Sequence, residues 1–115
     1  MLRFANDVKY IHIPHARKVR ALLEKGEGGL GVYLVYLNAP SEPGGNIFEI
    51  VRADAWGPPR SGKRGVVVCV CASRDDARGF LLDAIRRFVA GGGDLALMHE
   101  VLYEEACGGE FSGAL

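Results

Sequence analysis

Residues 65–100 constrain the fold more than any other part of the chain, because an apolar run, a helix start signal and an amphipathic segment follow one another directly. Residues 66–71 are apolar and mostly β-branched, and so short a run predicts a strand buried on both faces. Ser73 and Asp76 have capping-box spacing: the Ser73 hydroxyl accepts the backbone N–H of Asp76, and the Asp76 carboxylate reaches back toward the helix start. The next segment predicts a helix whose apolar face is formed by Ala77, Phe80, Leu81, Ala84, Ile85 and Phe88.

The other elements follow from shorter patterns. A short helix is predicted over residues 15–25, and strands are predicted over residues 8–13, 31–38, 47–53 and 95–103. The order β-α-β-β-β-α-β predicts an α+β fold, a mixed α/β sandwich in which two helices pack against one face of a mixed β-sheet. Residues 1–103 then form a single compact domain, and residues 104–115 are expected to be a mobile C-terminal tail.

Composition limits the classes of function. The chain has 115 residues, of which 49% are hydrophobic, and this suits one domain. Lys plus Arg and Asp plus Glu number 14 each, so the broad positive surface that nucleic acid or anionic lipid binds is not expected. No apolar run has the length of a membrane span, and the N-terminus has no signal-peptide core. We therefore expect a cytoplasmic protein that binds neither nucleic acid nor membranes.

The cysteines do not indicate a metal centre. Cys69 and Cys71 lie at i and i+2 of one predicted strand and point to the same side, while Cys107 is distant in the sequence. A zinc site needs four convergent ligands, and this spacing with three scattered histidines does not supply them. We expect buried, reduced thiols and no metal.

Residues 57–63, GPPRSGK, match the first seven positions of a phosphate-binding loop, but Arg64 stands where Ser or Thr would hold magnesium. The segment also runs into a strand rather than a helix N-terminus, and its two prolines remove amide donors. Nucleotide hydrolysis and a bound cofactor are therefore not expected. Two interpretations of Arg60, Lys63 and Arg64 stay open: a basic loop that docks an anion, or an exposed basic loop without a ligand.

The histidines and Arg74 lie near the ends of predicted elements. His12 is expected to point outward from its strand and His15 to lie at a helix start, and neither has a visible partner. Alternation along the last predicted strand places His99 and Glu100 on opposite faces, which excludes a catalytic pair within that strand. Arg74 is placed to hold an anion together with the first-turn amides of its helix, although the two aspartates that follow it compete for the same positive field.

The stretch VVVCVCASRDDARGFLLDAIRRF resembles the large, catalytic subunit of molybdopterin synthase. In that family a valine-rich strand runs into Ala-His-Arg, then an amphipathic helix with an Ala four residues beyond the His, then a strand carrying Trp-Lys-Lys/Arg-Glu. The residues in register with the first motif are Ala72, Ser73, Arg74 and Ala77, and LMHE at residues 97–100 matches the last. The front of the chain is similar too, with a short helix RKVRALLEKGEGG and a hydrophobic strand GVYLVYLN, so the resemblance covers most of the chain.

Three departures from the family pattern bear on chemistry. Leu37 stands where the family has an Arg, Ser73 replaces the His, and Met98 with His99 replaces the Lys-Lys/Arg pair. A strand and helix that the family carries before residues 47–53 are also missing. Family members transfer sulfur from the thiocarboxylated Gly-Gly tail of a small ubiquitin-like partner to a cyclic pyranopterin phosphate, and a lysine captures the intermediates. Methionine lacks that amine.

Two functions follow from the resemblance, and a third stands apart from it. The first is a divergent molybdopterin synthase large subunit of molybdenum cofactor biosynthesis, a sulfurtransferase whose activity is weakened or lost, with an anion pocket formed by Arg74, His99, Lys63 and Arg64. The second is a non-catalytic assembly or regulatory subunit of the same fold, and the third is an unrelated small anion-binding domain. The resemblance implies a homodimer and a small ubiquitin-like sulfur-carrier partner. Convergence of Arg74 and His99 on one cleft would favour the first function.

Overall fold

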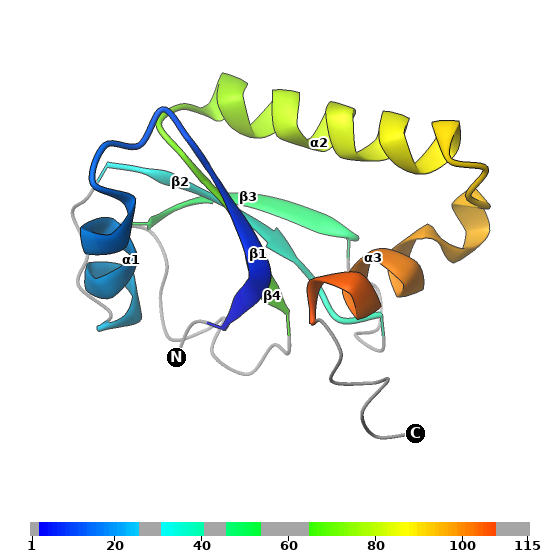
Figure 1. Cartoon of the computed structure of the whole chain (residues 1–115), viewed down its shortest axis with the longest axis horizontal. Helices are drawn as coiled ribbons and strands as arrows, with labels where there is room; N and C mark the ends of the chain where they lie inside the picture. Colours follow the sequence, from blue (N-terminus) through cyan, green and yellow to red (C-terminus); the bar gives the residue numbers. More distant parts are fainter. Residues whose placement is uncertain (1–2, 26–30, 41–45, 54–64, 108–115) are drawn as a thin grey trace.

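The structure, a computed structural model, describes residues 3–25, 31–40, 46–53 and 65–107. Within these residues the strands are β1 (Phe4–Ile11), β2 (Tyr33–Leu37), β3 (Phe48–Arg52) and β4 (Val66–Cys71). The helices are α1 (Ala16–Glu24), α2 (Arg74–Ala90) and α3 (Met98–Ala106), and a 3₁₀ turn, η3 (Leu95–Leu97), precedes α3. Figure 1 shows the arrangement of these elements. None of the described helices is long and apolar enough to cross a membrane.

The four strands form one mixed sheet in the order β1-β4-β2-β3, which confirms the α+β class. β1 runs parallel to β4, whereas β2 is antiparallel to both β4 and β3. Every residue of β4 is buried, as predicted for the valine-rich run. β4 therefore lies at the centre of the fold, and the position of its last residues determines where the following helix begins.

β4 contains an irregularity that changes which side chains face each side of the sheet. Val35 is opposite Cys69, but the next residue, Tyr36, is opposite Val67, so Val68 is an extra residue in β4. One side of β4 consequently carries Val66, Val68, Cys69 and Cys71, and the other carries Val67 and Val70. The two cysteines share a face, as the i and i+2 spacing predicts.

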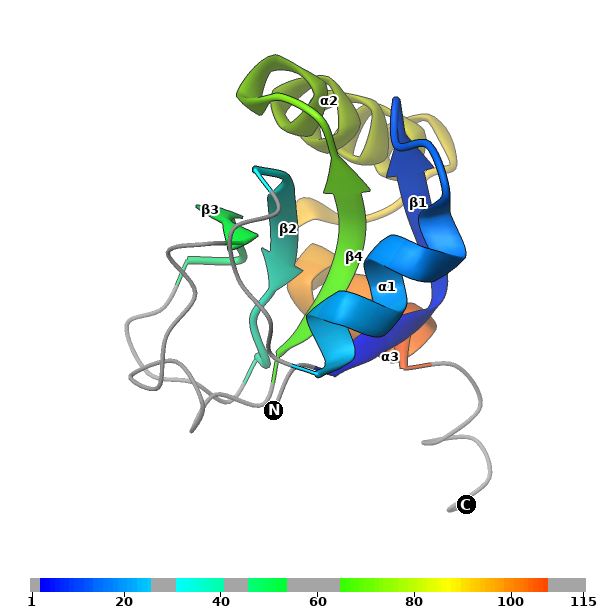
Figure 2. The same cartoon turned by 90° about the vertical axis from the view of Figure 1, so that its left-hand side faces the viewer.

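The helices divide between the two faces of the sheet, and the prediction that both would pack on one face is wrong. α1 packs Leu23 and Val19 on one face, whereas Ala77 of α2 and Tyr103 of α3 lie in the cluster on the other. In Figure 2, α1 lies on one side of the sheet and α3 on the opposite side. The central strands are apolar on both faces, so both faces require cover.

The predicted strand over residues 95–103 is also wrong, because this segment forms η3 and α3. The Asp94 side chain accepts the N–H of Ala96 at 3.0 Å and starts the turn. Met98, Leu102 and Ala106 then recur every four residues, which brings them to one side of a helix. Glu104–Ala106 belong to α3 rather than to the predicted tail, and residues 108–115 lie outside the described part of the chain.

Candidate functional site

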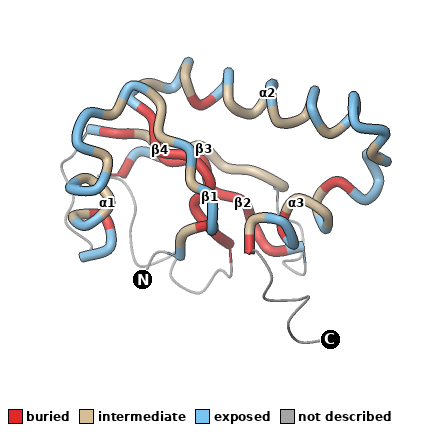
Figure 3. The backbone as a smooth tube through the Cα atoms, viewed as in Figure 1, coloured by how far each residue is buried: buried red, intermediate tan, exposed pale blue. Residues whose placement is uncertain are grey.

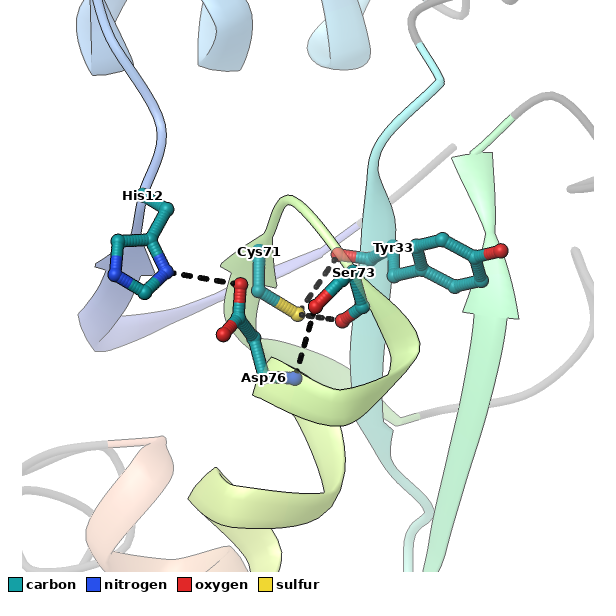
Figure 4. A network of polar contacts seen from close by, with 5 residues as sticks. All are labelled: His12, Tyr33, Cys71, Ser73 and Asp76. Atoms are coloured by element: carbon teal, nitrogen blue, oxygen red, sulfur yellow. Dashed lines mark hydrogen bonds and ion pairs between the residues drawn. The ribbon is translucent and has the colours of Figure 1, made fainter.

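At the junction between β4 and α2, five residues from separate parts of the chain form a network of polar contacts (Figure 4). Ser73 is the N-cap of α2, with extended backbone, and its Oγ accepts the N–H of Asp76 at 3.1 Å. This confirms the predicted helix start. We call the group formed by His12, Tyr33, Cys71, Ser73 and Asp76 the β4–α2 corner.

The Asp76 carboxylate makes a contact that the sequence did not reveal. His12 Nδ1 donates to Asp76 Oδ2 at 3.0 Å, and the hydrogen bond holds the pKa of Asp76 below its usual value. His12 follows the last residue of β1 with a φ of 56°, a left-handed conformation that is uncommon for a residue other than glycine. His12 was expected to lie on the strand without a partner. Its partner is instead 64 residues away along the chain.

Cys71 is the fully buried member of the corner. Its thiol is 3.6 Å from the carbonyl oxygen of Tyr33 and 3.5 Å from that of Ser73, and it donates toward these acceptors. Cys69 is buried on the same face of β4, and the hydrogen bond with Cys71 together with burial raises the pKa of the Cys69 thiol. A thiol whose pKa is raised is protonated and a weak nucleophile at neutral pH. The expected burial of both cysteines is confirmed, and all three cysteines are free.

Arg74 lies on the side of the corner away from His12. Its guanidinium carbon is 5.6 Å from the centre of the Tyr33 ring, within the range of a cation–π contact, and the residue is exposed. Tyr33 is the first residue of β2, whereas His12 follows β1. In Figure 4 the two rings flank the first turn of α2 from opposite sides.

His99 lies elsewhere, in the first turn of α3. Its Nε2 donates to the backbone carbonyl of Asn38 at 2.6 Å, and Asn38 follows the last residue of β2. Asn38 is itself buried and donates from Nδ2 to the carbonyl of Asn46 at 2.6 Å. His99 therefore fastens α3 to the chain that leaves β2.

Arg74 and His99 do not converge on one cleft. They contact opposite ends of β2, at Tyr33 and just beyond Leu37, roughly 16 Å apart along an extended strand. Lys63 and Arg64, with the rest of residues 57–64, lie outside the described residues. Of the four residues expected to share an anion pocket, Arg74 and His99 therefore lie apart, and the prediction for Lys63 and Arg64 stays a prediction.

Met98 is 7% exposed and is the first residue of α3, where the resembled family has a lysine on a strand. At the β4–α2 corner Ser73 caps a helix and the Cys71 thiol is directed to backbone carbonyls. The side chains drawn together at the corner are thus occupied in structural hydrogen bonds. Among the described residues, no three His, Cys, Asp or Glu side chains are grouped closely enough to hold a metal ion.

A cavity of about 570 Å³ opens between α2, α3 and β1, away from the corner. Phe80, Phe88 and Leu102 supply its apolar walls, and Asp7 and Glu105 add negative charge beside the ion pair of Arg87 with Asp83 at 2.7 Å. None of the residues that the sequence singled out for function lines it.

Comparisons of this chain with models of protein families, with curated proteins and with solved structures find no match.

Proposed function

We propose that this protein is a non-catalytic subunit of the molybdopterin synthase large-subunit type, which has lost sulfur transfer and keeps an anion contact at Arg74. The proposal combines the resemblance of residues 65–100 to that family with the positions of the residues that depart from it. Of the two functions that the resemblance implies, the geometry favours the assembly or regulatory subunit.

The burial of Met98 is the observation that carries the proposal. A lysine that captures a covalent intermediate needs an amine exposed to substrate. The Met98 side chain instead faces the protein interior, and its neighbour His99 donates to a backbone carbonyl. No described residue of α3 therefore presents an amine in place of the family's lysine, because the helix contains neither Lys nor Arg.

Arg74 supports the binding half of the proposal. It is exposed, and the ring of Tyr33 holds its guanidinium beside the N-terminus of a 17-residue helix. Helix N-termini favour anions because their first N–H groups are unpaired. The carboxylates of Asp75 and Asp76 repel an anion there, but the Asp76 carboxylate already accepts a hydrogen bond from His12.

A two-part assay tests the proposal. Sulfur transfer from a thiocarboxylated ubiquitin-like carrier to cyclic pyranopterin phosphate should be absent, while the carrier or the pterin phosphate should bind. Calorimetry should show weaker pterin phosphate binding for Arg74→Ala and unchanged binding for Arg78→Ala, a matched exposed arginine one turn further along α2. Turnover by the natural chain would refute the loss of catalysis, and equal binding by both variants would remove Arg74 from the site.

A further inference from the structure

The outer side of α2 carries residues that no other described element covers. Five exposed residues at intervals of three and four share this side of the helix: Asp75, Gly79, Leu82, Arg86 and Val89. We call them the α2 strip. Leu82 and Val89 expose 54% and 49% of their surface. The opposite side of the helix packs on the sheet through residues such as Ala77 and Phe80, and Figure 3 shows the outer side exposed along the helix.

Nothing among the described residues of one copy packs closely enough on Gly79 to require a glycine there. Glycine in a helix interior is destabilising relative to alanine, because it loses more backbone freedom on folding. A Cβ at Gly79 would meet nothing within 4 Å, and the residue lies in the middle of a regular helix. Glycine is useful at such a position when a second surface approaches the helix closely.

The α2 strip is complementary to itself when two copies of α2 pair in antiparallel orientation. In an antiparallel pair, residues that lie equally far from the crossing point on the two helices face each other. If the crossing point lies between residues 80 and 81, Gly79 faces Leu82 of the second copy and Asp75 faces Arg86. Two-fold symmetry repeats each contact, as an isologous interface requires. The intervals of three and four residues match the layers of an antiparallel helix pair.

The charges in this register are available for pairing. The Asp75 side chain is 93% exposed, and its ion pair with Arg78 is long, at 3.9 Å. Arg86 is exposed as well. Acid near the start and base near the end of one helix face each other only when the two helices run in opposite directions, so the charges select the antiparallel pair over the parallel one.

We propose that the α2 strip is the interface of a homodimer in which Leu82 of each copy packs into the notch at Gly79 of the other, between two Asp75–Arg86 ion pairs. Val89 then lies beside the exposed Ala72 that precedes the helix cap. One helix per copy is a small interface, so the dimer is weak and depends on protein concentration. The resemblance implies a homodimer but does not place its interface, and the assignment of the interface to the α2 strip rests on the described residues of α2 and not on the proposed function.

Charge reversal provides the sharpest test. Sedimentation velocity from micromolar to millimolar protein should show dimerisation of the natural chain. Asp75→Arg and Arg86→Asp should each weaken it by at least about tenfold, because each places like charges at two symmetric contacts. An equimolar mixture of the two variants should form a heterodimer, since the opposite charges then face each other. The double variant Asp75→Arg/Arg86→Asp should form a homodimer again.

Gly79→Ala separates association from folding. It should raise the melting temperature of the dilute monomer, because alanine is the better helix former, yet weaken the dimer by filling the notch. Glu104→Arg, the same type of charge change at an exposed site on α3, should leave the dimer intact. The proposal is overturned if the natural chain stays monomeric at millimolar concentration, or if it dimerises and both charge reversals leave the dissociation constant unchanged.

Discussion

The two ends of β2 differ in what the side chains of Arg74 and His99 do there. At the start of the strand, Arg74 is exposed over the Tyr33 ring, and its guanidinium remains accessible to solvent. At the other end, His99 donates to the carbonyl of the buried Asn38 and ties α3 to the sheet. A charged residue type therefore does not indicate a binding site by itself. The distinction lies in whether its donors are already directed to the protein's own acceptors.

The largest loss of stability is expected at Met98, which precedes His99 in the chain and lies in α3. Met98→Lys places an unpaired ammonium in a site that is 7% exposed, and it should lower the free energy of unfolding by about 3 kcal/mol. Leu97→Lys is the matched control because Leu97 is 50% exposed, and it should change stability by less than about 0.5 kcal/mol. Urea titration measures both. Equal stability of the two variants would show that Met98 is accessible and would reopen the question of a lysine equivalent.

Replacing Arg74 and His99 in turn compares the ends of β2 directly. His99→Leu leaves the Asn38 carbonyl without its donor and should cost about 2 kcal/mol of unfolding free energy. Arg74→Ala removes an exposed cation–π contact and should cost about 0.5 kcal/mol. The same two variants should show the reverse order for anion binding, with Arg74→Ala the more damaging. A reversed order of stabilities would contradict the assignment of His99 to structure and Arg74 to binding.

The sequence predicts the β4–α2 side well because its signals are local. The valine-rich run, the Ser73 to Asp76 spacing and the apolar stripe lie within one continuous segment, and each concerns neighbours no more than four residues apart. The His12 contact with Asp76 carries no such signal. It exists because β1 and β4 are parallel neighbours, with Ile11 opposite Cys71, so both strands end at the same edge.

The His99 side was mispredicted because two patterns fit the same short segment. Residues 95–103 are short and mostly apolar, which is compatible with a buried strand, but Met98, Leu102 and Ala106 also recur at the helical interval of four. The second pattern extends beyond the proposed strand end into Glu104–Ala106, residues with good helix propensity. A longer window would have favoured the helix. The division of helices between both faces follows from a sheet that is apolar on both sides, which the sequence did indicate for β4.

A smaller effect is expected at the cap of α2. Ser73→Ala removes the acceptor of the Asp76 N–H and should cost about 1 kcal/mol of unfolding free energy. Ser73→Asp keeps an acceptor at the same position and should recover most of this loss. Thermal unfolding monitored by circular dichroism measures both variants. If Ser73→Ala melts at the same temperature as the natural chain, the cap does not stabilise the helix. The hydrogen bond from Asp76 N–H to Ser73 then does not fix the first turn on which Arg74 lies.

The smallest effect concerns the pH dependence of the contact between His12 and Asp76. The hydrogen bond from His12 lowers the pKa of Asp76 in the folded protein below its unfolded value of 3.8. Its contribution is therefore fully present above that value, and it is lost as the pH falls through the lower pKa of the folded state. Asp76→Asn should be less stable than the natural chain at pH 6, and the difference should shrink as the pH falls below the unfolded value of 3.8 and through the lower pKa of the folded state. His12→Asn should abolish most of the same pH dependence, and the double variant should behave like either single variant, because the two residues share one interaction. Additive losses in the double variant would show that the side chains act separately, and the φ of 56° at His12 would then need another explanation.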